Sequence, residues 1–315
     1  MTSQENKRMP KVSVVIGTYN REEFLPTTLK CLASQTADYS LYEILIVDNN
    51  SSDSTREIAE AFMADYPKVD TKYLLETNQG HTFARNRGIV ESKGEIISFI
   101  DDDAFVGEDY IENIIRFFKR YINAVVLGGR IVPKYESSEP KWMSRYLLPL
   151  VAALDMGNGI KKFSGSKFPI GANMAFRKEV FDQYGVFDTS LGRRGTNLEG
   201  GDEKELIERI KLKNKGIYYV PDVKVDHIIP NRRLDMEYIK GLAVGVGTSE
   251  RRRMGKEGIN FRIKKIFSES IKIAGTFVLF LLYSIRLQPE KAIVLLKFRW
   301  WVIIGLFQRQ NINQP

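Results

Sequence analysis

Short apolar runs alternate with amphipathic stretches along the first 121 residues. The runs have the length of buried strands, and the stretches between them carry apolar residues at helical spacing, as Leu25, Leu29 and Leu32 do. We expect strands at 12–18, 43–48, 71–76 and 95–100, with helices at 22–35, from Asp53, at 80–93 and at 109–121. Strands that alternate with helices predict a mostly parallel sheet with helices on both faces.

The remainder of the chain is less regular until its last third. We expect a strand at 123–132, and then loops with a short helix near 141–147, because residues 133–170 hold four prolines. Helices are expected at 177–184 and 202–215, an extended segment at 216–228, and almost continuous helix from 235 onward. The pattern predicts an α/β fold with a helical C-terminal extension, divided into a polar tail at 1–10, a catalytic domain at 11–250 and a basic, apolar tail at 251–315.

Charge and cysteine content narrow the possible surroundings. The chain carries a net charge of +8, but residues 251–315 alone hold 13 Lys and Arg and 3 Asp and Glu, a balance of +10. A basic tail on a nearly neutral body indicates contact with an anionic surface. The single cysteine, Cys31, indicates a reducing compartment, and the polar start lacks the apolar stretch of a secretory signal.

Polar residues gather where the first two predicted strands end. They are Thr18, Asn20 and Arg21 after the first strand, and Asp48, Asn49, Asn50, Ser51 and Ser52 after the second. Ligands of open α/β sheets bind at the carboxyl ends of strands. The plainer interpretation of the second cluster is a turn with an N-cap at Ser52 or Asp53, while Asp48 could also accept a nucleobase N–H.

The strand at 95–100 runs directly into three carboxylates, Asp101, Asp102 and Asp103. Alternation along a strand end places Asp101 and Asp103 on one side and Asp102 on the other. Adjacent carboxylates repel one another, and a hard divalent cation such as Mg²⁺ or Mn²⁺ removes that cost. The alternative is a solvated acidic turn.

Three further positions are chemical candidates with structural alternatives. Arg85 lies near the start of a predicted helix, where anions bind well, although a surface helix face would carry arginine too. Asp202 and Glu203 open another helix after two glycines, as a general base or simply as favourable partners of the helix dipole. His227 follows an alternating strand, either as a structural histidine or as a metal ligand beside Asp103.

Several common enzyme motifs are missing from the sequence. No G-x-G-x-x-G, Walker A, H-E-x-x-H or G-x-S-x-G pattern occurs. Dinucleotide-dependent oxidoreductases, P-loop kinases and α/β-hydrolases are therefore disfavoured.

With these motifs in order, residues 11–250 resemble the inverting family-2 glycosyltransferases with the GT-A fold. The segments that carry the resemblance are VSVVIGTYNR, VDNNSSDST, NQGHTFARNRG, FIDDDA, GANMAFRKEVF, GGDEKEL and the late His227. The resemblance implies that a nucleotide-sugar is held by Thr18, Asn20, Arg21, Asp48, Arg85, Asp101 and Asp102. It implies Mn²⁺ or Mg²⁺ on Asp103 and His227, and a sugar and acceptor site at Gly171, Ala172 and Asn173.

The sequence departs from the family at the catalytic base. The family reads Glu-Asp before x-[DE]-L, whereas this chain reads Asp202-Glu203 before Lys204-Glu205-Leu206. Alignment on Leu206 makes Glu203 the base, and a shift of one residue makes it Asp202. The implied reaction is a single inverting displacement by an acceptor hydroxyl, with no covalent intermediate.

The resemblance and the tail together predict the partners. We expect a nucleotide-sugar donor, most commonly a UDP-sugar, a glycan or lipid-linked acceptor, and no nucleic acid. Residues 261–308 are expected to lie on the inner face of the plasma membrane from the cytoplasmic side, because Lys297 and Arg299 interrupt the last apolar run. The alternative is a helical hairpin packed on protein. The rival functions are a sugar-1-phosphate nucleotidyltransferase and a non-catalytic membrane-bound binder.

Overall fold

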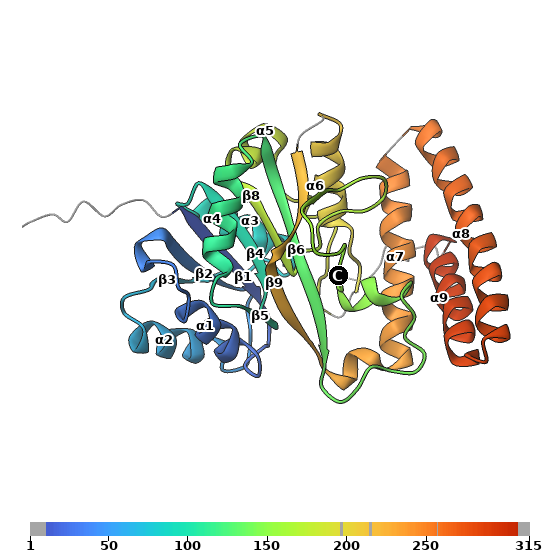
Figure 1. Ribbon diagram of the computed structural model, residues 1–315, viewed down its shortest axis with the longest axis horizontal. Helices are drawn as coiled ribbons and strands as arrows, with labels where there is room; N and C mark the ends of the chain where they lie inside the picture. Colours follow the sequence, from blue (N-terminus) through green and yellow to red (C-terminus); the bar gives the residue numbers. More distant parts are fainter. Residues whose placement is uncertain (1–10, 196–197, 214–215, 257, 308–315) are drawn as a thin grey trace, which may run out of the picture. The chain divides into compact units, whose positions relative to one another are not determined.

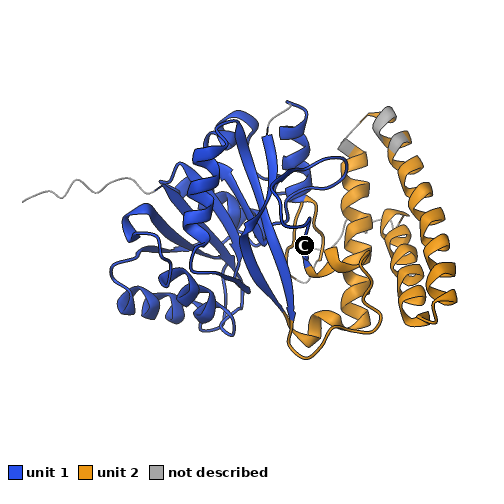
Figure 2. Cartoon of the chain, viewed as in Figure 1, with its two compact units in different colours: residues 1–134, 152–190, 202–228 blue, residues 135–151, 191–201, 229–315 orange. Residues whose placement is uncertain are grey.

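The computed structural model describes residues 11–195, 198–213, 216–256 and 258–307 (Figure 1). They form two compact units (Figure 2). Unit 1 comprises residues 1–134, 152–190 and 202–228, and unit 2 comprises residues 135–151, 191–201 and 229–315.

Nine strands of the described chain form one sheet in the order β3-β2-β1-β4-β8-β6-β9-β5, with β7 paired to β9. The strands are β1 (Val12–Thr18), β2 (Tyr42–Asp48), β3 (Asp70–Leu75), β4 (Ile96–Asp101), β5 (Ala104–Val106), β6 (Ala124–Tyr135), β7 (Lys161–Lys162), β8 (Asn173–Arg177) and β9 (Gly216–Ile229). The first four pair in parallel, and β8 joins β4 in the antiparallel sense. The structure confirms the predicted α/β fold with flanking helices; the parallel part of the sheet is β1 to β4, and β4 with β8, β6 with β8, β5 with β9 and β7 with β9 pair in the antiparallel sense, so the sheet is mixed.

Helices cover both faces of the sheet, and each face has its own apolar core. The helices of unit 1 are α1 (Leu25–Ala33), α2 (Thr55–Asp65), α3 (His81–Glu91), α4 (Tyr110–Arg120), α5 (Glu179–Tyr184) and α6 (Asp202–Lys211). One core joins alternate residues of β1, such as Val14, to α1, α2 and α4. The other joins Val15 to α3, α5 and α6. Alternation along β1 therefore feeds both cores.

Sequence periodicity located the long elements and missed the short ones. The predicted strand at 123–132 and the extended segment at 216–228 are β6 and β9. The predicted short helix at 141–147 is wrong: the helical turn in this region is the 3-10 helix η2, Leu148–Val151. Strands β5, β7 and β8 were not predicted, because five residues or fewer show no clear period.

Unit 2 ends in three long helices, as the sequence predicts from residue 235 onward. They are α7 (Met236–Lys256), α8 (Ile259–Ile285) and α9 (Pro289–Phe307), and two 3-10 helices, η1 (Tyr39–Leu41) and η3 (Asn231–Leu234), complete the described helices of the chain. The predicted domain boundary at 250 falls inside α7, which is continuous. Helix α9 packs against both α7 and α8.

Glycines bring α7 and α9 into close contact. A Cβ at Gly247 would lie 2.2 Å from the carbonyl oxygen of Val302, and one at Gly305 would lie 2.1 Å from that of Val244. Among the described helices, Lys265–Ile285 of α8 is long and apolar enough to cross a membrane, and only 11% of that stretch is buried.

Candidate active site

The strand register brings the predicted polar ends to one edge of the sheet. Thr18 is opposite Asp48 in the β1–β2 pair, and Gly17 is opposite Asp101 in the β1–β4 pair. Asn173 begins β8 opposite Ile100, so this strand starts where β4 ends. Residues from three separate predicted clusters therefore lie near one another.

Asp101, Asp103 and His227 converge at this edge. A candidate ligand atom from each lies within 4.8 Å of the other two. The His227 Nε2 atom lies 2.9 Å from Asp103 Oδ1 and 4.0 Å from Asp101 Oδ2. The short strand β5 creates this contact, because it pairs Ala104 with His227 immediately after the carboxylates. Two carboxylates and an imidazole form a donor set that suits a divalent cation.

Asp102 lies outside the group of three candidate ligands. Its Oδ1 atom lies 3.7 Å from Arg21 Nε, in the loop after β1. Burial and the neighbouring charge of Asp103 raise the pKa of Asp102 to about 7. Asp102 and Arg21 thus form a second polar pair, separate from the candidate metal ligands.

Side-chain hydrogen bonds fix the polar residues that follow β2, and the N-cap side chain of α2 makes no capping hydrogen bond. The Tyr73 hydroxyl donates to Asp48 Oδ2 at 2.6 Å, and the Ser51 N–H donates to Asp48 Oδ1 at 2.9 Å. Asn20, at φ +52°, accepts a hydrogen bond from the Ser52 N–H at 2.8 Å. Thus the loops after β1 and β2 are tied together, and the buried Asp48 carboxylate has a fixed orientation.

Arg85 of α3 connects the two acidic clusters. Its Nη1 donates to Asp202 Oδ2 at 2.7 Å and to Glu203 Oε1 at 3.0 Å, and its Nη2 lies 3.9 Å from Asp101 Oδ1. The guanidinium is 2% exposed and lies over the ring of Phe187. The resemblance implied a nucleotide contact for Arg85, whereas the structure gives it the carboxylates that open α6 as partners.

The two carboxylates at the start of α6 have opposite pKa shifts. Burial, followed by the charge of Glu203, raises the pKa of Asp202 to about 7. Burial also acts to raise the pKa of Glu203, but Arg85 and a hydrogen bond from Asp202 outweigh it and lower that pKa. Burial opposes the charge of Arg85, yet the surrounding carboxylates leave the pKa of its guanidinium raised. The directions of the two shifts make Glu203, beside Arg85, the more acidic carboxylate of the pair.

The predicted acceptor segment divides into two parts. A Cβ at Gly171 would lie 1.9 Å from Arg85 Nη2 and 2.3 Å from Glu203 Oε1, so only glycine leaves room for this ion pair. Asn173 is fully buried: its amide donates to the carbonyls of Arg130 and Val223, and it accepts from the Tyr110 hydroxyl. The structure places Gly171 against the carboxylates and the Asn173 side chain in the interior, next to the buried Ala172.

Sequence reasoning gave no role to His81 or Tyr73. The His81 ring lies beside Gly17, where an added Cβ would be 3.5 Å from His81 Cδ2. His81 stood in a quoted segment, NQGHTFARNRG, and could have been noted there. Tyr73 carried no signal, because a tyrosine in a strand is ordinary.

The sequence is similar to characterised transferases. A family model described as Glycosyl transferase family 2 matches residues 13–185. The glucosyl-dolichyl phosphate glucuronosyltransferase of Haloferax volcanii is 26% identical over 246 residues, 76% of each chain. Glycosyltransferase AglE of the same organism is 30% identical over 194 residues, which span 62% of this chain and 59% of that one.

Solved structures share the fold. The mannosyltransferase PcManGT from Pyrobaculum calidifontis, in complex with GDP-Man and Mn²⁺, aligns with a TM-score of 0.69 at 16% identity, covering 96% of this chain and 88% of that one. S. aureus TarS 1-349, in complex with UDP-GlcNAc, aligns with a TM-score of 0.55 at 16% identity, covering 95% and 93%. These neighbours are GT-A glycosyltransferases.

Proposed function

The chain belongs to glycosyl transferase family 2, and from this premise we propose that it is an inverting, metal-dependent hexosyltransferase. It transfers a sugar from a nucleotide-sugar, most commonly a UDP-sugar, to a hydroxyl of a glycan or lipid-linked acceptor. One observation carries the proposal: Asp101, Asp103 and His227 converge next to an acidic pair that Arg85 holds in place.

The residues at the sheet edge divide the work of donor binding. Asp103 and His227, with Asp101, would hold Mn²⁺ or Mg²⁺; the imidazole favours the transition ion. When bound, the cation would offset the charge that develops on the leaving diphosphate. Thr18, Asn20, Arg21, Asp48 and Asp102 lie around the same strand ends and bind the nucleotide.

The acidic pair activates the acceptor. Glu203 is the base, because alignment on Leu206 places it at the family's base position and its Oε1 atom is held by Arg85 at 3.0 Å. Arg85 orients the Glu203 carboxylate, and Gly171 leaves the space for it. The acceptor oxygen then attacks the anomeric carbon opposite the nucleotide, so the configuration inverts in one step.

The setting of the reaction is proposed from the relatives and the C-terminal helices. The Haloferax volcanii glucuronosyltransferase is named for a dolichyl phosphate substrate. A Campylobacter jejuni relative is named for an undecaprenol substrate and is 36% identical over 97 residues, 30% of each chain. A lipid-linked acceptor and a cytoplasmic protein on the inner face of the membrane, attached through residues 261–308, fit these names and the apolar surface of α8.

The test is Asp103→Asn in the full chain. We expect it to abolish sugar transfer and to remove Mn²⁺-dependent binding of the donor, measured by calorimetry with and without a chelator. His227→Ala should weaken the same binding less. Asp182→Asn, on an exposed carboxylate of α5, is the matched control and should leave both unchanged. Near-normal transfer by Asp103→Asn would refute the metal assignment.

A further inference from the structure

Helix α8 presents an uncharged stripe to the outside along its whole length. The stripe consists of large apolar side chains spaced by three, four or seven residues, among them Ile263, Phe267, Ile271, Val278, Leu281 and Ile285. All six are more than half exposed, from 57% at Ile271 and Val278 to 78% at Ile285. Contiguous exposed apolar surface of this kind marks an interaction site, so we expect another molecule to cover the α8 stripe.

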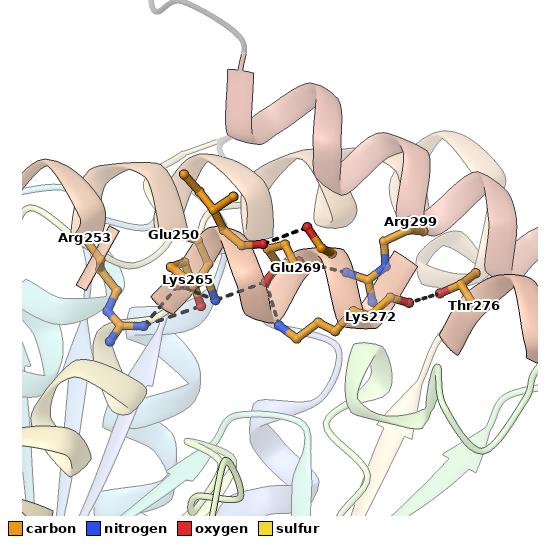
Figure 3. Close-up of polar contacts among 9 residues, drawn as sticks. Glu250, Arg253, Lys265, Glu269, Lys272, Thr276 and Arg299 are labelled. Carbon is orange, nitrogen blue, oxygen red and sulfur yellow. Dashed lines mark hydrogen bonds and ion pairs between the residues drawn. The ribbon is translucent and has the colours of Figure 1, made fainter. Parts of the chain in front are cut away.

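A network of ion pairs joins α8 to its neighbouring helices (Figure 3). Glu269 is its centre: Lys272 Nζ lies 2.6 Å, Lys265 Nζ 3.2 Å and Arg299 Nη1 of α9 3.1 Å from its carboxylate. Lys265 also lies 2.8 Å from Glu250 of α7. Three helices are therefore joined through side chains of α8.

The network determines which side of α8 faces outward. At 100° per residue, Lys265 and Glu269 fall on the side of the helix away from Ile263 and Phe267. Their ion pairs to α7 and α9 hold that side inward and turn the stripe outward. Buried ion pairs contribute little net stability, so we infer that the role of these pairs is to fix the rotation of α8.

The charges that these helices carry away from the stripe indicate its occupant. The exposed ionic side chains of α8, α9 and the turn between them are mostly basic: Arg262, Lys272, Arg286 and Lys297, with Glu290 as the acidic exception. Residues 251–315 carry a balance of +10, and this excess of positive charge favours an anionic partner over a second copy of the same basic segment. An anionic lipid surface accommodates the apolar stripe and attracts the basic charge of the surrounding helices.

The packing of α9 indicates how α8 meets the lipid. Helix α9 contacts both α7 and α8, and the glycine contacts bind it closely to α7. Within the described chain only the α8 stretch is apolar enough to cross a bilayer, and α7 is not. A spanning α8–α9 hairpin would pull charged α7 into hydrocarbon. We propose that α8 lies in the plane of an anionic membrane with its stripe in the acyl region. This inference rests on the membrane association proposed above.

The first test is flotation of the full chain with vesicles. Wild type should bind vesicles of mixed phosphatidylcholine and phosphatidylglycerol, and bind pure phosphatidylcholine more weakly. The double variant Phe267→Ser, Val278→Ser should bind the mixed vesicles at least about tenfold more weakly. The control is Val90→Ser, Ile122→Ser, which removes two apolar residues of unit 1 that are more exposed than the tested pair and should bind as wild type.

The second test measures depth. In a Cys31→Ser background, an environment-sensitive label is placed on single cysteines at Ile263, Ile271 and Leu281. If the helix lies in the membrane plane, lipid-borne quenchers should report the same depth for all three labels. If it spans the membrane, the label at Ile271 should lie deep and the label at Ile263 should lie closer to the surface.

Three results would overturn the proposal. The first is equal vesicle binding by the stripe variant and wild type, and the second is unequal depths of the three labels. The third is a wild-type dimer in solution that the Phe267→Ser, Val278→Ser variant does not form. None of these measurements uses sugar transfer. If they contradict the in-plane placement of α8, the active-site assignment is unaffected. If the enzyme proves inactive, the placement of α8 is unaffected.

Discussion

Arg85 is a buried cation whose charge is met by carboxylates from two distant parts of the chain. Asp101 ends a central strand, while Asp202 and Glu203 open α6 more than a hundred residues later. Removing a partner from such a group leaves an uncompensated buried charge. The residues of the candidate site are therefore coupled, and single substitutions there test geometry as well as chemistry.

The choice of base is tested by paired variants and a pH profile. Glu203→Gln should lose transfer by about 10²–10⁴-fold while donor binding persists, and Asp202→Asn should lose less. Because the pKa of Glu203 is lowered, the wild-type rate should hold as the pH falls from about 8 to about 6. The pKa of Asp202 is raised to about 7, so a base at Asp202 would protonate in that interval and the rate would fall with it. A fall there, with the larger loss in Asp202→Asn, would reverse the assignment.

Gly171 offers a purely steric test of the same pair. An alanine Cβ would overlap Arg85 Nη2 and Glu203 Oε1, so the ion pair must shift. We expect Gly171→Ala to lower kcat by about 10²-fold with little change in donor affinity, since misplacement of a catalytic group is costly. Gly159→Ala is the control, because nothing lies within 4 Å of its added methyl. Equal steady-state kinetics for the two variants would show that the pair is not needed in this geometry.

At the scale of elements, the C-terminal helices combine a close backbone crossing with an exposed apolar helix. Gly305→Ala places a methyl group 2.1 Å from the Val244 carbonyl oxygen and should lower the free energy of unfolding by about 1–3 kcal/mol. Gly275→Ala, inside α8 with nothing within 4 Å, should raise it by about 0.5–1 kcal/mol. Urea denaturation of the two variants measures both signs. A stabilised Gly305→Ala would mean that α7 and α9 separate readily.

At the scale of the whole molecule, charge is concentrated in one part of the chain. Residues 251–315 carry a balance of +10 against +8 for the full sequence. We expect vesicle binding to weaken about tenfold between about 0.05 M and about 1 M salt, as the Debye length shrinks to about 3 Å. Some binding should persist at high salt because the α8 stripe is unaffected by screening. If vesicle binding did not change with salt, the basic charges would make no contribution to it.

The sequence determined the local layout of the catalytic domain. Apolar periodicity predicted β1, β2, β3 and β4 with their helices, because strand and helix spacing are properties of a few consecutive residues. Polar residues at the ends of those strands identified the edge where the candidate site lies, and their spacing grouped Asp101 with Asp103. The ordered motifs identified the family.

The tertiary structure alone decided how those parts meet. Residue spacing could not show that β5 pairs Ala104 with His227, or that Arg85 reaches Asp202 across 117 positions of the chain. From the sequence, Arg299 is a charge within an apolar run. In the structure, packing of α9 on α8 pairs Arg299 with Glu269. The physical reason is the same in each case. A side chain's partners depend on which distant elements pack together, and local periodicity carries no information about that.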